Sequence, residues 1–212
     1  DIKIYDRVFK EKPISNLIGG MGYNNGLILF ILFSHYQPKV TVESGVWRGF
    51  TTYLIDKAIP DDSIIYCFDI DLHKNEFHSK KANYIEKDIT LFDELDLDTV
   101  DFAFFDDHIS IYDRLKLCLK NKIKIIVVDD DVSFTQVHTD TEPPVPTASM
   151  IFNYDNIPKK FEWVSNGKPF SLDISNIDVD NIRNSFKYIA FPSLKEFTGF
   201  DNSSFTSLLL RK

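Results

Sequence analysis

Carboxylates follow four of the apolar segments of this chain, where they could bind a cation or move a proton. These acids are Glu43, Asp69, Asp71, Asp106, Asp107, Asp129, Asp130 and Asp131. If the segments are parallel strands, their carboxyl ends meet at one sheet edge, where ligands bind in such folds. Neighbouring carboxylates raise one another's pKa, so a cluster around Asp106 and Asp129 requires a counter-ion. A hard divalent cation such as Mg²⁺, which prefers oxygen ligands, is the natural one.

A histidine beside these acids could act as a general base. His108 lies two residues beyond Asp106, and a neighbouring carboxylate would fix its tautomer and raise its pKa toward neutrality. Asp106 and His108 are therefore the candidate catalytic residues. A histidine that is only structural or exposed is the alternative. His138 precedes a proline-rich loop and is a second candidate for facing a substrate.

Two glycines separate a strand-like segment that ends at Glu43 from a helix-like segment. The spacing is Glu-x-Gly-x-x-x-Gly, with Gly45 and Gly49 as the glycines. Such a turn lets a ligand lie against bare backbone, with the amides of a helix N-terminus beneath it. Trp47 and Arg48 fill the middle, so the dinucleotide fingerprint Gly-x-Gly-x-x-Gly is absent. This argues against a buried pyrophosphate and an NAD-dependent oxidoreductase, and favours a nucleoside held by an acid.

The sequence of this turn, Glu-Ser-Gly-Val-Trp-Arg-Gly over residues 43–49, resembles the first motif of class I S-adenosylmethionine-dependent methyltransferases. Its Gly-Val-Trp-Arg-Gly core is most similar to the macrocin O-methyltransferase family, which methylates sugar hydroxyls on macrolides. The resemblance in element order covers residues 24–190. It implies S-adenosylmethionine as cofactor and a small-molecule acceptor, a sugar or other hydroxyl compound. Members of that family, like the distantly similar catechol O-methyltransferases, depend on magnesium.

The resemblance also implies which residues bind the cofactor. They are Glu43, Gly45, Val46, Trp47, Gly49, Thr51, Asp69, Asp71, Asp88 and Asp106. Asp69, with Asp71 as the weaker candidate, is expected at the ribose hydroxyls, and Asp88 near the adenine amino group. Glu43 would hold the glycine turn or bind the cofactor's amino group through water. A helix cap at Asp69 and an exposed turn at Asp88 are the structural alternatives.

Carried over position by position, the metal ligands of these families become Asp106, Asp129 and Asp130. A metal there would bind the acceptor hydroxyl and lower its pKa, so that an alkoxide forms near neutral pH. His108 or one of the acids would take the proton. Helix capping by Asp107 and Asp130, with the other acids as solvated loop charges, is the alternative.

This chain departs from both families beside Asp106. The turn Asp106-Asp107-His108 lacks the glycine of the usual Asp-Gly-Asp-like turn. The catechol enzymes have a lysine three residues beyond the first ligand, where this chain has Ile109. His108 is therefore the best remaining candidate for the base.

Apolar runs alternate with amphipathic segments, which predicts an α/β fold: a doubly wound, Rossmann-like, mostly parallel sheet. The resemblance makes it the seven-stranded methyltransferase type. We expect strands at residues 39–43, 63–68, 83–86, 100–105 and 124–128, helices at 51–58 and 110–121, and a buried helix at 26–33. A helical turn is expected at 148–152. The resemblance adds a sixth and a seventh strand at 161–165 and 188–191, the seventh antiparallel.

With 212 residues and 43% hydrophobic content, the chain suits one domain with a large core. We expect a single domain over residues 1–212, with a helical lead-in at 1–38, a core at 39–192 and a tail at 193–212. The tail could be a lid, a docking segment or frayed.

Charge and apolar content narrow the partners. The net charge is −8 and Lys and Arg form no cluster, which argues against nucleic acid. The longest apolar run, residues 26–33, is far shorter than the roughly 20 residues of a membrane span, and it lacks the features of a signal peptide. Cys67 and Cys118 are expected as buried thiols of a cytoplasmic protein. The apolar N-terminal helix and the aromatic tail could form a homo-oligomer interface.

Two further functions stay open. One is a methyltransferase without a metal, in which the acidic cluster is structural. The other is a non-catalytic or nucleotide- or sugar-binding Rossmann-like protein, because such folds support many functions.

Overall fold

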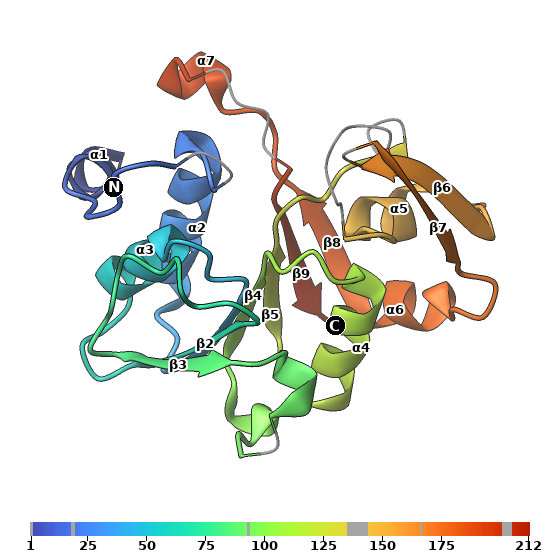
Figure 1. Ribbon diagram of the computed structural model, residues 1–212, viewed down its shortest axis with the longest axis horizontal. Coiled ribbons are helices and arrows are strands. Elements are labelled where there is room, and N and C mark those ends of the chain that lie inside the picture. Colours follow the sequence, from blue (N-terminus) through green and yellow to red (C-terminus); the bar gives the residue numbers. More distant parts are fainter. Residues whose placement is uncertain (1, 18–19, 93, 135–143, 166, 201–204) are drawn as a thin grey trace.

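The computed structural model describes residues 2–17, 20–92, 94–134, 144–165, 167–200 and 205–212. Its centre is a seven-stranded sheet with the order β3-β2-β1-β4-β5-β9-β8 (Figure 1). The strands are β1 (Val40–Ser44), β2 (Ile64–Asp69), β3 (Ala82–Glu86), β4 (Phe102–Phe105), β5 (Ile125–Val128), β8 (Phe186–Ala190) and β9 (Ser207–Arg211). The first five are parallel, and β9 is antiparallel to both of its neighbours. The predicted α/β fold with a seven-stranded, mostly parallel sheet is confirmed.

Helices cover both faces of this sheet (Figure 1). They are α1 (Ile2–Lys10), α2 (Tyr23–Tyr36) and α3 (Phe50–Ala58) on one face, and α4 (Ile111–Lys120), α5 (Ala148–Asn153) and α6 (Val179–Ser185) on the other. In the chain, α7 (Lys195–Thr198) follows β8 and precedes β9, and it lies away from the sheet (Figure 1). Short 3₁₀ turns stand at Ile89–Leu91 and Leu97–Thr99. No helix among the described residues is long and apolar enough to cross a membrane.

Alternation along β4 shows why the strands read as continuous apolar runs. Phe102 and Phe104 pack in the core that contains α2 and α3. Ala103 and Phe105 pack in the core that contains α4. Because both faces are covered, every residue of β4 is apolar. For an acid that follows the end of a strand, the same alternation determines the face of the sheet to which its side chain points.

Three expectations about the last third of the chain were wrong. The strand expected to be antiparallel, at residues 188–191, is β8, which is antiparallel to β9 and therefore runs in the same direction as β5. The segment predicted as the sixth strand is β6 (Lys160–Ser165), which pairs with β7 (Lys168–Asp173) in a separate hairpin. The tail beyond residue 192 supplies β9, inserted between β5 and β8, so the core does not end at 192. Leu208 packs on the face of α2 and Leu209 on the face of α4, and burial on both faces is what holds β9 in the sheet.

Cys67 and Cys118 are buried, as expected. His138 lies outside the described residues, as does most of the proline-rich segment 139–147. Within its described end, Thr147 caps α5 by accepting a hydrogen bond from the backbone N–H of Met150.

Candidate active site

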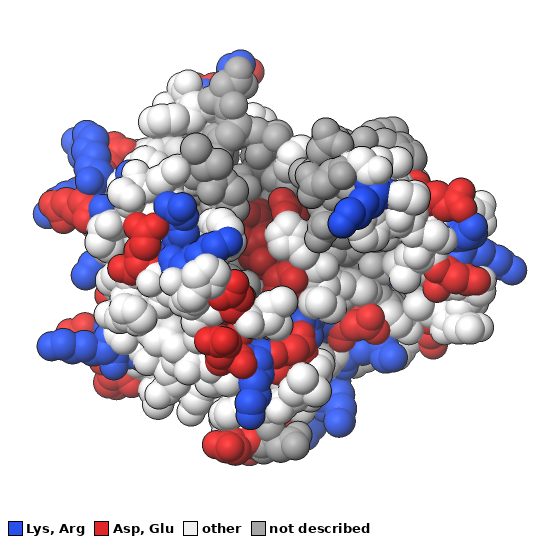
Figure 2. Space-filling view, in the orientation of Figure 1, with Lys and Arg blue, Asp and Glu red and all other residues white. Residues whose placement is uncertain are grey.

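The carboxyl edge of the parallel strands contains a cavity of about 460 Å³. It is lined by Ser44, Gly45, Trp47, Phe68, Asp69, Ile70, Lys87, Asp88, Asp106, Asp107, His108 and Ile109. On the face that Figure 2 shows, acidic side chains gather in the central hollow. Five of the ten predicted cofactor residues line the cavity: Gly45, Trp47, Asp69, Asp88 and Asp106.

The glycine turn needs both of its glycines. Gly45 has φ +94°, and a Cβ there would lie 2.2 Å from the backbone oxygen of Asp106. Gly49 has φ +82° and precedes the first turn of α3. Trp47 also has a positive φ, 50°, and is 41% exposed. Trp47 therefore borders the cavity instead of filling the core.

Asp69 fixes this turn from the end of β2. Its Oδ2 accepts hydrogen bonds from the backbone N–H of Val46 at 2.8 Å and of Trp47 at 2.9 Å. Its Oδ1 accepts one from the backbone N–H of Asp71 at 3.0 Å. The carboxylate thus holds the turn and borders the cavity at once. Asp71 itself is exposed and bonds to the ring of His73.

Glu43 lies beneath the turn, not at the cavity surface. It is fully buried, and its carboxylate accepts hydrogen bonds from the hydroxyls of Thr51 and Thr52, the latter at 2.6 Å, and from Cys67 at 3.2 Å. Burial raises the pKa of Glu43 to about 7, although these hydrogen bonds oppose the shift. Glu43 therefore ties β1 to α3, which fits the expected role of holding the turn.

Arg114 of α4 was missed by the sequence analysis. It is 2% exposed, and its guanidinium binds the two oxygens of Asp88 at 2.5 and 3.3 Å and Oδ2 of Asp107 at 2.8 Å. Burial raises the pKa of Asp88, but the hydrogen bonds from Arg114 and Thr90 outweigh burial and lower it to about 2. Arg114 lies on the buried face of α4 with Ile111, Leu115 and Cys118, and a single arginine there carries no local signal for this role.

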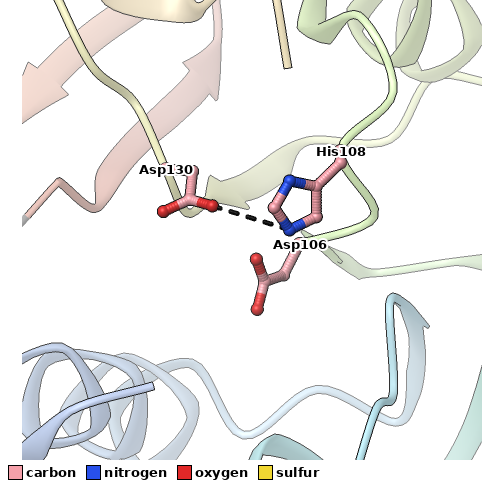
Figure 3. A group of neighbouring side chains, drawn as sticks. All are labelled: Asp106, His108 and Asp130. Carbon is pink, nitrogen blue, oxygen red and sulfur yellow. Dashed lines mark ion pairs between the residues drawn. The ribbon is translucent and has the colours of Figure 1, made fainter. Parts of the chain in front are cut away.

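Three predicted side chains come together above the ends of β4 and β5 (Figure 3). Asp106, His108 and Asp130 each offer a ligand atom, and these atoms lie within 4.8 Å of one another. His108 Nε2 lies 3.7 Å from Asp130 Oδ2. Both of these residues have left-handed backbones, with φ of 56° and 54°, a conformation that histidine and aspartate adopt more readily than most residues. The turns thus point all three side chains toward one place.

The electrostatics of this group favour a positive charge. Burial, with the charges of Asp129 and Asp130, then Asp107 and Glu43, raises the pKa of Asp106 well above its usual range. A cation or an added proton would relieve this repulsion. Two carboxylates and an imidazole make a donor set for a divalent transition metal, since imidazole suits such ions better than Mg²⁺.

Asp129 is not one of these three side chains, and the expected triad of Asp106, Asp129 and Asp130 stays a prediction. β5 alternates between the two faces, and Asp129 points to the same face as Val127, toward α2. There it is 6% exposed and accepts hydrogen bonds from Asn25 at 3.1 Å and Thr206 at 2.7 Å. Burial, followed by the charge of Asp130, raises the pKa of Asp129 to about 6.

Arg48, in the middle of the glycine turn, pairs with Glu76 at 2.9 Å. Asp107 does not cap α4: Ser110 is the N-cap. Two cofactor candidates, Val46 and Thr51, are buried and line a smaller hollow of about 30 Å³ beside Gly45 and Asp106.

No protein-family model matches this chain, and no curated protein matches it. Solved structures do. The O-methyltransferase TomG from Streptomyces achromogenes, involved in tomaymycin synthesis and solved with S-adenosylmethionine, is 13% identical with a TM-score of 0.52, covering 100% of this chain and 89% of that one. An O-methyltransferase from Bacillus cereus with S-adenosylhomocysteine is 13% identical with a TM-score of 0.52, covering 99% and 91%.

A methyltransferase from Podospora anserina, bound to S-adenosylhomocysteine, is 11% identical with a TM-score of 0.55, covering 100% of this chain and 87% of that one. The chain has the fold of these methyltransferases. At such low identity the likeness establishes the fold and leaves the activity to be argued from the site.

Proposed function

We propose that this protein is an S-adenosylmethionine-dependent methyltransferase that methylates a hydroxyl group of a small-molecule acceptor. The observation that carries the proposal is the cavity that joins the glycine turn to Asp106 and His108 at one sheet edge. A cofactor in the cavity and a hydroxyl at the acidic cluster would then be neighbours. The likeness of fold to O-methyltransferases supports this assignment.

The residues at the cavity fit the cofactor. Gly45 leaves backbone open at the turn, and Asp69, already oriented by the N–H of Val46 and Trp47, would accept hydrogen bonds from the ribose. Asp88 would accept one from the adenine amino group. When bound, S-adenosylmethionine supplies an electrophilic methyl group. The protein's contribution is then to hold the acceptor oxygen in line with it.

His108 would accept the proton of the acceptor hydroxyl. Its ring nitrogen Nε2 lies 3.7 Å from Asp130, and the carboxylates of Asp130 and Asp106 would stabilise the imidazolium that forms. The three side chains thus provide both the base and its charge partners.

A divalent cation is the second way in which this cluster could work. When bound, it supplies a Lewis acid that lowers the pKa of the hydroxyl. Asp106, His108 and Asp130 would hold it. His108 would then be a ligand and could not also be the base, so a requirement for metal decides between the two versions.

Isothermal titration with S-adenosylhomocysteine, in EDTA and then with Mg²⁺ or Mn²⁺, tests the proposal. We expect micromolar binding that Asp69→Ala weakens by about 2 kcal/mol, because a charged hydrogen bond is lost. Asp62→Ala is the matched control, since this exposed aspartate pairs with Lys39 and does not line the cavity. If the wild-type protein does not bind S-adenosylhomocysteine under any of these conditions, the proposal is wrong.

A further inference from the structure

Asn25, in the first turn of α2, is a buried polar residue beside the acidic cluster. It is 9% exposed, and its Nδ2 donates a hydrogen bond to Asp129 Oδ1 at 3.1 Å. The neighbouring Asn24 faces elsewhere: its side chain contacts Thr198 at 2.7 Å and the backbone oxygen of Phe200 at 3.2 Å. The two adjacent asparagines therefore have different tasks.

The amide oxygen of Asn25 is buried and has no hydrogen-bond donor in the part of the chain that the structure describes. The orientation of the amide follows from its partner, because only the nitrogen can donate to a carboxylate. An unpaired buried acceptor is costly, and native structures rarely keep one without a reason. A ligand that carries an N–H or O–H group would satisfy it.

The surrounding charge restricts the class of that ligand. Asp129 is 6% exposed, and its Oδ1 already accepts from both Asn25 and Thr206. The carboxylates of Asp106 and Asp130 belong to the same strand-end edge. A donor group placed among these acids gains most if it is cationic, because a buried negative charge is stabilised by an opposite one. An ammonium group provides both the donors and the charge.

Position in the sheet separates this place from the cavity. The cavity is lined by residues at or just beyond the ends of β1, β2, β3 and β4, among them Asp69, Asp88 and Asp106. Asp129 follows β5, and Thr206 precedes β9, the neighbour of β5 on the side away from β4. Asp106 therefore lies between a nucleoside in the cavity and the Asn25–Asp129 pair, which puts the pair on the acceptor side.

We propose that Asn25 and Asp129 bind the ammonium group of an acceptor that carries both an amine and the hydroxyl to be methylated, as amino sugars and amino alcohols do. That the ammonium compound is the methyl acceptor rests on the proposed function. The ammonium subsite itself depends only on Asn25, Asp129 and the charges around them.

Binding of two matched pairs of probes tests this inference. Glucosamine is compared with glucose, and ethanolamine with ethylene glycol, by ligand-observed NMR titration of the full chain in EDTA, with and without saturating S-adenosylhomocysteine. We expect each ammonium compound to bind about tenfold or more tightly than its neutral partner, as for a charged hydrogen bond. If each ammonium compound binds with the same affinity as its neutral partner, or if neither ammonium compound binds, the inference is overturned. Water would then be the hydrogen-bond donor to the Asn25 amide oxygen.

Two variants assign the preference to the pair. Asn25→Leu should abolish it while binding of 5′-methylthioadenosine, which lacks an amino-acid part, stays near wild type. Asn24→Ala is the control, since it alters the same turn of α2 but leaves Asn25 in place. A preference that survives Asn25→Leu overturns the inference. If Asn25→Leu fails to fold, Asn25→Ser, which keeps a small polar side chain but withdraws the amide oxygen, is read in the same way.

The cofactor also carries an ammonium group, and the same variant distinguishes this source. If Asn25→Leu weakens S-adenosylhomocysteine but leaves glucosamine unaffected, the ammonium belongs to the cofactor and the acceptor assignment is wrong. Failure of the proposed function reads differently, because S-adenosylhomocysteine then does not bind the wild-type protein at all.

Discussion

Arg114 binds Asp88 through both carboxylate oxygens, at 2.5 and 3.3 Å, and thereby ties α4 to the end of β3. The same guanidinium binds Asp107 beyond β4. With Arg114 only 2% exposed, this is a buried ionic bridge between two strand ends that border the cavity. Its removal would leave two carboxylates without their counter-charge.

Arg114→Met should therefore lower the free energy of unfolding by about 3–5 kcal/mol, the usual cost of breaking a buried ion pair from one side. Urea denaturation measures it. Lys122→Met is the control, because the Lys122–Asp98 pair at 3.4 Å is largely exposed, and such pairs contribute about 1 kcal/mol or less. Equal losses in the two variants would show that Arg114 does not stabilise the strand ends.

Part of the loss of folding stability at low pH should come from protonation of Asp88. Its pKa falls from 3.8 to about 2 in the folded protein, so the unfolded chain binds a proton first. The contribution to stability is present above pH 4 and lost as the pH falls toward 2, and it amounts to about 2 kcal/mol. In Asp88→Asn this loss between pH 4 and 2 should be absent, as urea denaturation at several pH values would reveal. A variant that loses as much stability as the wild type over that interval contradicts the assignment.

The glycine turn offers a matched pair of substitutions. Gly45 and Gly199 both have positive φ, but a Cβ at Gly45 would meet the backbone of Asp106 at 2.2 Å, whereas one at Gly199 has no described atom within 4 Å. Gly199→Ala should cost about 1 kcal/mol from the backbone alone. Gly45→Ala should cost about 1–3 kcal/mol more from overlap and weaken S-adenosylhomocysteine binding. Equal unfolding free energies for the two variants would mean that the close approach to Asp106 carries no constraint.

The place of the acids could be predicted because each follows a continuous apolar run. β4 and β5 are buried on both faces, and such runs are typical of central parallel strands. Strands of this kind end at one edge, so Asp106 and Asp130 were expected to meet, and they do.

What each acid does could not be predicted, because it depends on partners distant in the sequence. Asp106 and Asp107 are adjacent, yet Asp107 points to the face of α4 and binds Arg114. Asp131 accepts hydrogen bonds from the backbone N–H of Ser149 at 2.5 Å and the hydroxyl of Tyr188 at 2.8 Å. It anchors α5 and β8, a structural role that no feature of the Asp-Asp-Asp run indicates.

The strand β9 was missed for a related reason. Its apolar part is only Leu208, Leu209 and Leu210, after a run of serines and phenylalanines. A run this short is compatible with helix, strand or a frayed end. It becomes a strand because β5 and β8 each offer it an edge.

Glu43 predicts a pH effect of opposite sign to that of Asp88. Its pKa rises from 4.5 to about 7 on folding, so the folded protein holds a proton that the unfolded chain has released. The resulting stabilisation is full below pH 4.5 and is lost as the pH rises to about 7, a change of about 3 kcal/mol.

Glu43→Gln stays neutral and can still bond to Thr51 and Thr52. Its stability relative to wild type should therefore increase by about that amount between pH 4.5 and 8, in urea denaturation at both pH values. Glu86→Gln, at an exposed position at the end of β3, should follow the wild-type curve. If Glu43→Gln follows it too, the buried carboxylate is ionised throughout this range and its hydrogen bonds outweigh its burial.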